Sequence, residues 1–249
     1  MKKVALITGA GSGIGKGTAE LFSREGWSVV GVDVNDVGDP VALDRFIRID
    51  ISMKDSPAQI IEQVRKEQGR LDALVNNAAM QVCKPLVETT AEEWDLTMAS
   101  NVRAPFLFCV AGHALLKKTG GAIVNVSSVH ALATSVSIAA YAASKGALLA
   151  LTKATALEFA QDNIRVNAVL PGAVDTPMLR SGLARGHLKG QSEDELIAEL
   201  GKKHPLERIG HPQEIAQAVL FLADSQRSGF MTGQALVVDG GATAKLSTE

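Results

Sequence analysis

The sequence of 249 residues contains few of the residues on which several classes of protein depend. It has two cysteines, Cys83 and Cys109, which form no Cys-x-x-Cys pair. This favours two reduced, packed thiols in a protein of the cytoplasm. Lysine and arginine number 25 against 27 aspartates and glutamates, which gives a formal net charge of −2. No basic face is indicated, so nucleic acid is not expected as a partner.

Long apolar runs and metal-ligand patterns are also missing. No stretch approaches the roughly 18 apolar residues of a membrane-spanning helix, so no membrane partner is expected. The apolar run Val4–Ile7 is shorter than the roughly 7–15 residues at the core of a secretory signal. The histidines lack the spacing of metal ligands, so no metal site is expected; they are His113, His130, His187, His204 and His211.

What the chain does contain is a regular alternation of two kinds of segment. Short β-branched runs predict strands at Val4–Thr8, Val29–Val32, Phe46–Ile49, Leu71–Val75, Ala122–Val126, Arg165–Val169 and Ala235–Val238. Between them, helices are predicted at Gly15–Glu25, Ala58–Gln68, Ala91–Ser100, Pro105–Lys118, Tyr141–Gln161 and Pro212–Ala223. This order predicts an α/β fold, a doubly wound Rossmann-like parallel sheet of about seven strands with helices on both faces. No linker is visible, so residues 1–249 are expected to form a single domain.

One segment, Val174–Gly210, departs from the alternation. It is long, charged and rich in glycine. A connection of this length inside a compact domain is usually a functional lid or a helical insertion, so we expect a substrate lid at about residues 174–210. Ser192, followed three residues later by Glu195, predicts the start of a short helix within it.

The N-terminal end of the chain carries the pattern of a nucleotide site. Gly9, Gly13 and Gly15 follow an apolar strand and open a helix. Glycine allows the sharp turn and the close approach of a pyrophosphate, and the helix N-terminus offers free N–H groups to the anion. Asp33, 20 residues after Gly13, can bind the adenosine ribose hydroxyls and would repel a 2′-phosphate.

A second group of residues carries chemistry. Tyr141 and Lys145 are four residues apart and share one face of a predicted helix. A nearby ammonium, together with an oxidised nicotinamide, would lower the pKa of the phenol from its ordinary value near 10 and make it a general acid or base. Ser128, or alternatively Ser127, ends a predicted strand and could hold the substrate oxygen.

The form Thr-Gly-x-x-x-Gly-Ile-Gly at residues 8–15, with Tyr-x-x-x-Lys at 141–145, resembles the short-chain dehydrogenase/reductase family. The resemblance runs from about residue 3 to 241, although Ala79 stands where the family has glycine. It selects Ser128 over Ser127 and implies a fourth catalytic residue, Asn101, which supports a water chain from the lysine. Members that prefer NADP carry a basic residue near positions 12 and 34, which are serine and valine here, so NAD is expected rather than NADP.

The resemblance also implies a set of contacts and an assembly. The family's helices at Pro105–Lys118 and Tyr141–Gln161, and its C-terminal strand, imply a homotetramer. The residues expected to bind the cofactor are Gly9, Ser12, Gly13, Ile14, Gly15, Asp33, Asp50, Ile51, Asn77, Ala78, Tyr141, Lys145, Pro171, Gly172, Val174 and Thr176.

These observations favour an oxidoreductase that transfers a hydride between NAD(H) and a secondary alcohol or its carbonyl. Basic residues in the segment 174–210 and the scarcity of aromatic residues favour a small polar hydroxy compound, such as a sugar or hydroxy acid. A 3-oxoacyl thioester or another apolar carbonyl is the alternative substrate, and a redox-silent NAD-binding regulator or a sugar epimerase is the alternative function. The residues expected at the substrate are Gln81, Ser128, His130 and Tyr141, with Ala131, Met178 and Leu179 beside them.

Overall fold

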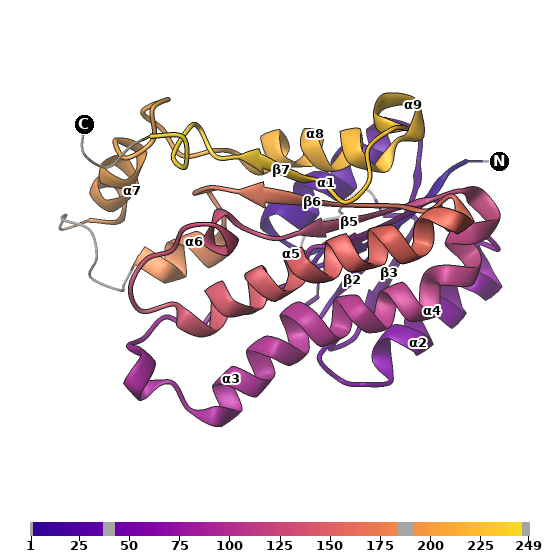
Figure 1. Ribbon diagram of the computed structural model, residues 1–249, viewed down its shortest axis with the longest axis horizontal. Helices are drawn as coiled ribbons and strands as arrows, with labels where there is room; N and C mark the ends of the chain where they lie inside the picture. The colour runs from indigo at the N-terminus through magenta and orange to yellow at the C-terminus, as the bar shows by residue number, and fades with distance from the viewer. Residues whose placement is uncertain (1, 37–42, 184–191, 246–249) are drawn as a thin grey trace.

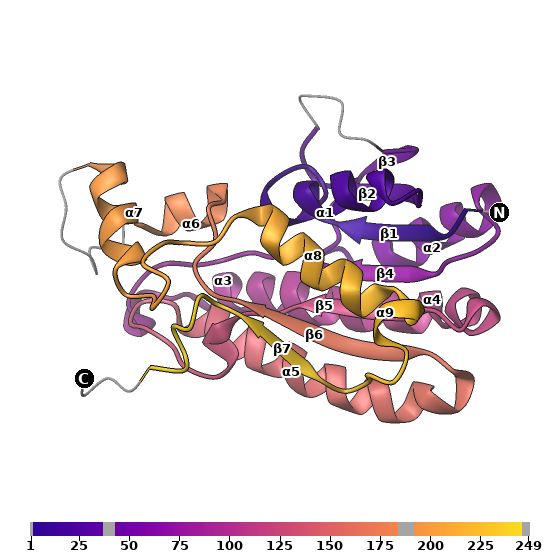
Figure 2. The same cartoon turned by 90° about the horizontal axis from the view of Figure 1, so that it is seen from above.

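The computed structural model describes residues 2–36, 43–183 and 192–245. Its centre is a sheet of seven strands, all parallel, in the order β3-β2-β1-β4-β5-β6-β7, which confirms the predicted fold. Figure 2 shows β3 at one edge and β7 at the other. The strands are β1 (Val4–Thr8), β2 (Ser28–Asp33), β3 (Arg45–Arg48), β4 (Ala73–Asn76), β5 (Ala122–Val126), β6 (Arg165–Pro171) and β7 (Ala235–Val238).

Helices cover both faces of the sheet because its strands are apolar on both sides (Figure 1). In β1, Ile7 packs in one core cluster with Phe22 of α1 (Gly13–Arg24) and Ile215 of α8 (Pro212–Ala223). Its neighbour Leu6 points to the opposite face and packs with Phe108 in a second cluster. The helices on this second face are α2 (Ser56–Glu67), α4 (Ala104–Thr119) and α5 (Ala139–Phe159).

The helices predicted on either side of residue 100 are both present, and they are joined directly. The chain runs without a break through α3 (Ala91–Met98), a turn of π-helix (η2, Ala99–Arg103) and α4. Pro105 follows the π-turn closely, and proline lacks an N–H and its ring disturbs the preceding turn. In the wider π-turn the N–H of Ala104 bonds to the carbonyl of Ala99, five residues back, so Pro105 is accommodated as a new α-helix begins.

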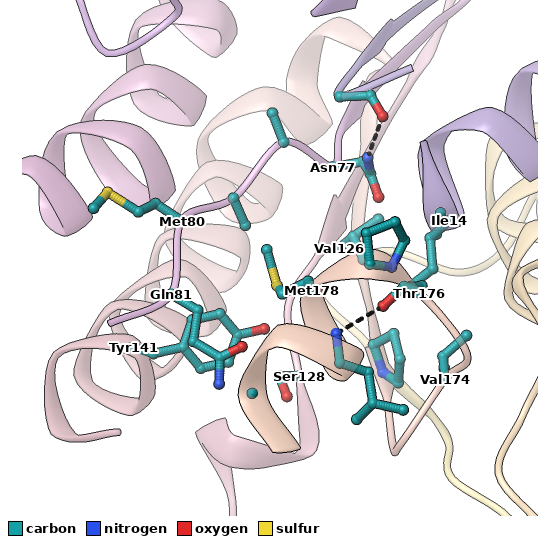
Figure 3. A pocket seen from close by; sticks show the side chains of 18 of the residues that line it. Ile14, Asn77, Met80, Gln81, Val126, Ser128, Tyr141, Val174, Thr176 and Met178 are labelled. Atoms are coloured by element: carbon teal, nitrogen blue, oxygen red, sulfur yellow. Dashed lines mark hydrogen bonds between the residues drawn. The ribbon is translucent and has the colours of Figure 1, made fainter. Parts of the chain in front are cut away.

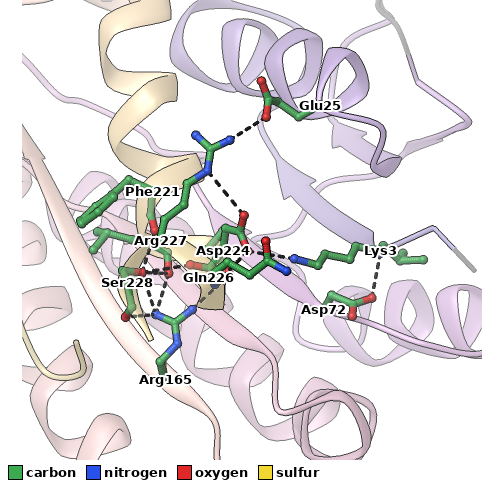
Figure 4. A network of polar contacts seen from close by, with 12 residues as sticks. Lys3, Glu25, Asp72, Arg165, Phe221, Asp224, Gln226, Arg227 and Ser228 are labelled. Atoms are coloured by element: carbon green, nitrogen blue, oxygen red, sulfur yellow. Dashed lines mark hydrogen bonds and ion pairs between the residues drawn. The ribbon is translucent and has the colours of Figure 1, made fainter. Parts of the chain in front are cut away.

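A polar network ties the elements together at the amino ends of the strands (Figure 4). The guanidinium of Arg165, at the start of β6, is buried and donates hydrogen bonds to the carbonyl oxygens of Leu222, Ala223 and Ser228. These bonds satisfy carbonyls at the end of α8 and in the short helix α9 (Ser225–Ser228). Asp224 accepts a hydrogen bond from Lys3, just before β1, at 2.8 Å. The network therefore fixes the end of the sheet opposite the pocket described below.

The segment predicted as a lid leaves the sheet and returns to the same place. Val174 and Gly210 form a parallel bridge, and the N–H of Asp175 bonds to Gly210 O at 2.9 Å. Between them lie α6 (Pro177–Gly182) and α7 (Glu193–Gly201), beyond the carboxyl ends of the strands (Figure 2). Ser192 caps α7 by accepting the N–H of Glu195, as predicted. Residues 184–191 of this segment lie outside the described residues.

Candidate active site

The main pocket opens where the strand order reverses, at the carboxyl ends of β1 and β4, which is where open α/β sheets bind their ligands. Its volume is about 690 Å³. Most residues that the sequence singled out line it: Gly9, Ser12, Gly13, Ile14, Asp33, Asp50, Ile51, Asn77, Ala78, Gln81, Ser128, His130, Tyr141, Lys145, Pro171, Gly172, Val174, Thr176, Met178 and Leu179. Gly15, Asn101 and Ala131 do not line it.

The glycine turn fits the cradle of a dinucleotide phosphate. Gly9 has φ +68°, which residues with a side chain rarely adopt. A Cβ added to Gly15 would lie 1.9 Å from Gly9 O, so Gly15 lies beneath the turn and lets the helix pack against it. The side chain of Ser12, at the N-cap of α1, makes no capping bond. The first N–H groups of α1 are therefore left for an anion.

Thr8, the first residue of the glycine motif, joins β1 to β4 beside this turn, a role that the sequence analysis did not assign to it. Its Oγ1 accepts hydrogen bonds from the N–H groups of Asn77 and Ala78, each at 3.0 Å. In return, Asn77 Nδ2 donates to Thr8 O at 2.9 Å and to Gly9 O at 3.2 Å. The sequence feature that could have indicated this role is a residue with a hydroxyl group at the end of an apolar strand. These bonds hold Asn77 and Ala78 against the glycine turn.

Asp33 and Asp50 rim the far end of the pocket. The carboxylate of Asp33 accepts the N–H of Gly11 at 2.9 Å and that of Asn35 at 3.0 Å. Asp50 accepts the N–H of Ser52 at 2.8 Å. Both carboxylates are thereby held in place at the ends of adjacent strands, where the sequence analysis expected contacts to the cofactor.

Tyr141, Lys145 and Ser128 meet at the other end of the pocket. Lys145 lies one turn of α5 after Tyr141, with Nζ 5.4 Å from the centroid of the phenol ring. Lys145 Nζ donates to Val126 O at 2.8 Å. Ser127 Oγ donates to the carbonyl of Lys145 at 2.9 Å, which leaves Ser128 as the serine that faces Tyr141. Figure 3 shows the side chains of Tyr141 and Ser128 together on one side of the pocket.

In the protein alone, burial shifts the pKa values of both Tyr141 and Lys145. It raises the pKa of Tyr141 to about 12, against a hydrogen bond with Ser128 that lowers it. Burial also lowers the pKa of Lys145 to about 7. The sequence analysis expected Lys145 and a bound oxidised nicotinamide together to lower the phenol's pKa. Without that second positive charge, burial moves the pKa of Tyr141 in the opposite direction.

Asn101 lies behind the pocket instead of in its wall, because the π-turn η2 directs it into the protein. It is 1% exposed. Its Nδ2 donates to Met80 O at 2.8 Å and to Ser144 Oγ at 2.9 Å, and its Oδ1 accepts the N–H of Met80 at 2.8 Å. Asn101 therefore fastens the segment after β4 to the helix that carries Tyr141.

The substrate end of the pocket mixes polar and apolar groups. His130 packs edge-on against Tyr141, with ring centroids 6.1 Å apart. Gln81 and Met178 also line the pocket, and in the view of Figure 3 Met178 is drawn between Tyr141 and Ile14. Ala131 does not line the pocket because it packs against a small core cluster formed by Leu149, Ala168 and Leu170.

The basic residues of the segment 174–210 divide into distinct groups. Arg180 is bound by the carboxylates of Asp175 and Glu193. Lys203 and His204 line the pocket. The sequence analysis treated the basic residues of this segment together and did not single out these two. His204 is 6% exposed, and its Nδ1 lies 2.9 Å from Leu200 O. Because a carbonyl only accepts, Nδ1 carries the proton there. Arg185, His187 and Lys189 lie outside the described residues.

Among the described residues, no cluster of three or more histidine, cysteine, aspartate or glutamate side chains could hold a metal ion. No helix in the same residues has the length and apolar character needed to cross a membrane.

Known proteins match almost the whole chain. A family model described as enoyl-(acyl carrier protein) reductase matches residues 9–243. A 3-oxoacyl-[acyl-carrier-protein] reductase of Thermotoga maritima is 37% identical over 96% of this chain and 97% of its own. An NAD-dependent glycerol dehydrogenase of Listeria innocua is 35% identical over 98% and 94%. A solved structure of the aldohexose dehydrogenase of Thermoplasma acidophilum superposes with a TM-score of 0.93, at 34% identity, over 99% of this chain and 96% of that one.

Proposed function

The chain belongs to the short-chain dehydrogenase/reductase family, and from this premise we propose that it transfers a hydride between NAD(H) and a secondary alcohol or its carbonyl. One observation carries the proposal. Ser128, Tyr141 and Lys145 meet at one end of a pocket whose other end is the glycine turn and Asp33. A proton-transferring group and a dinucleotide cradle therefore share one cavity.

The cofactor would be held by backbone and carboxylate groups. The N–H groups at the start of α1 would bind the pyrophosphate, and Asp33 would bind the adenosine ribose. We propose NAD because a carboxylate at this position repels a 2′-phosphate. When bound, the nicotinamide supplies the hydride donor or acceptor. Ser12 makes no side-chain capping bond, so the helix N-terminus is open for these contacts.

Tyr141 is the proposed proton donor and acceptor. With a pKa raised to about 12 by burial, its phenol is protonated at neutral pH and can donate to a carbonyl oxygen during reduction. Ser128 supplies a second hydroxyl at the same oxygen and would stabilise the developing negative charge. Oxidation of an alcohol needs the phenolate, so a positive charge near Tyr141 and higher pH both favour that direction.

The proposed substrate is a small polar hydroxy compound such as a sugar or hydroxy acid. Gln81, His130, Lys203 and His204 line the pocket and offer hydrogen-bonding groups to substrate hydroxyls. A site built around such groups rejects analogues that lack the hydroxyls. The names of the glycerol and aldohexose dehydrogenases agree with this class. We also propose that the segment 174–210 acts as a lid, since its two ends are joined and its helices line the pocket.

A 3-oxoacyl thioester is the second candidate, because the pocket has an apolar side as well. Met178, Leu179, Leu183 and Leu200 line it from α6, α7 and the residue after α6. The similarity to a 3-oxoacyl-[acyl-carrier-protein] reductase points the same way.

A substrate panel tests both proposals. Sugars, polyols, hydroxy acids, aliphatic ketones and a 3-oxoacyl thioester would be assayed by the absorbance of reduced nicotinamide, with NAD(H) and NADP(H). We expect the highest kcat/KM for a sugar, polyol or hydroxy acid. A value at least tenfold higher for the thioester or an apolar ketone, about 1.4 kcal/mol, would reject the polar substrate. Tight NADH binding with no turnover of any compound would support a regulatory protein instead.

A further inference from the structure

The register of β2 and β3 brings a basic side chain to the carboxylate proposed to select the cofactor. Arg48 and Asp33 are paired Cα partners at the carboxyl ends of these strands. The preceding pair, Val32 and Ile47, both pack in the core cluster on the face covered by α2 and α4. Successive side chains of a strand point to opposite faces, so Asp33 and Arg48 project side by side from the other face.

Arg48 does not pair with its neighbour Asp33. Its Nη1 lies 2.7 Å from Asp36 Oδ2, and its Nε donates to Val34 O at 3.3 Å. Val34 and Asp33 both line the pocket, so the guanidinium is fastened directly behind its rim. The side chains of Arg48 and Asp36 are 61% and 73% exposed, and such ion pairs contribute little in water. The guanidinium can therefore exchange Asp36 for another anion at small cost.

We propose that Arg48 is a latent binding residue for the 2′-phosphate of NADP, and that two carboxylates keep the site selective for NAD. Asp33 repels the phosphate at the rim, and Asp36 holds the guanidinium away from it. An arginine near the ribose is the group that accommodates a 2′-phosphate, because its planar fork binds two oxygens at once. The inference rests on the proposed function, since it assigns a residue to one part of the proposed dinucleotide.

The test compares variants within one background, so that the lost bond between Asp33 and Gly11 affects all of them equally. Dissociation constants of NADPH and NADH would be measured by fluorescence for Asp33→Ala, for Asp33→Ala with Arg48→Ala, and for Asp33→Ala with Arg45→Ala. Arg45 is the matched control, because it lies on the same strand, is exposed and pairs with Glu67.

We expect removal of Arg48 to weaken NADPH binding at least tenfold relative to NADH. A tenfold loss corresponds to about 1.4 kcal/mol, which is the size of one charge-assisted hydrogen bond. Removal of Arg45, three residues along the strand, should change the same ratio by no more than about twofold, since exposed charges at that distance are screened. Adding Asp36→Asn to Asp33→Ala should tighten NADPH binding, because it releases the guanidinium.

Equal NADPH affinities with and without Arg48, or equal losses from Arg48→Ala and Arg45→Ala, would overturn the inference. If Asp33→Ala does not fold, Asp36→Asn is compared with Asp36→Asn plus Arg48→Ala, and the same tenfold loss is required. Failure of the proposed dinucleotide site has a different signature. In that case the wild-type protein binds neither NADH nor NADPH, whereas failure of this inference alone leaves NADH binding intact and Arg48 without effect.

Discussion

The buried amine of Lys145 should make the stability of the protein depend on pH. Burial lowers its pKa from 10.5 to about 7, so between these values the unfolded chain binds a proton that the folded chain has lost. Stability must therefore rise with pH across this window. Each pKa unit corresponds to about 1.36 kcal/mol. Integrated from about pH 7 to about pH 10, the gain is roughly 3 kcal/mol.

The substitution Lys145→Met removes the titrating amine and keeps an unbranched side chain. The variant also loses the hydrogen bond to Val126 O, but this loss changes the free energy of unfolding by an amount that does not vary with pH over this range. Free energies of unfolding would be measured in urea at several pH values for the wild type, for Lys145→Met and for Lys153→Met. Lys153 is the control, because it lies on the same helix and is exposed.

We expect the wild type and Lys153→Met to gain about 3 kcal/mol more than Lys145→Met between the two pH values. The measurements stay at or below about pH 10 because the raised pKa of Tyr141 makes stability fall with pH above the phenol's ordinary value. Parallel curves for the wild type and Lys145→Met would refute the claim that burial disfavours the ammonium of Lys145 in the folded protein.

Three further outcomes are expected. Tyr141 is the chain's single tyrosine, so ultraviolet titration of the phenolate should give a midpoint well above 10 in the protein alone and a lower one with NAD; an unchanged midpoint would contradict the proposed role of the cofactor's charge. Arg165→Leu should lower the free energy of unfolding by about 2–4 kcal/mol, because it removes the buried donor to the carbonyls of Leu222, Ala223 and Ser228; a loss below about 1 kcal/mol would show that water replaces the guanidinium. Light scattering should give about four times the 26.1 kDa subunit mass, since α4 and α5 expose apolar side chains such as Val110; a monomer's mass would rule out the proposed tetramer.

The parts of the site that depend on local spacing could be read from the sequence. The glycines of residues 9–15 were predictable because the turn and the helix start are built by consecutive residues. Tyr141 and Lys145 were predictable because residues one helical turn apart share a face. The order of strands and helices was predictable for the same reason, since hydrophobic periodicity is a property of short segments.

The features that depend on how distant segments pair could not be read in this way. Nothing in the sequence states which residue of β3 lies beside Asp33, so Arg48 was missed. Thr8 and Asn77 are 69 positions apart, and their bonds follow from the adjacency of β1 and β4. The π-turn that buries Asn101 could not be predicted either, because a proline such as Pro105 does not distinguish the end of a helix from a local widening.

The most direct test of the central claim is the rate of reduction by Tyr141→Phe with saturating NADH and the best substrate of the panel. The variant keeps the ring and loses only the hydroxyl that is proposed to give the proton. Proton transfer contributes about 10²–10⁴-fold, so we predict a fall in kcat of at least the lower value, with the dissociation constant of NADH nearly unchanged. Turnover like that of the wild type would contradict the assignment of Tyr141 and the mechanism built on it.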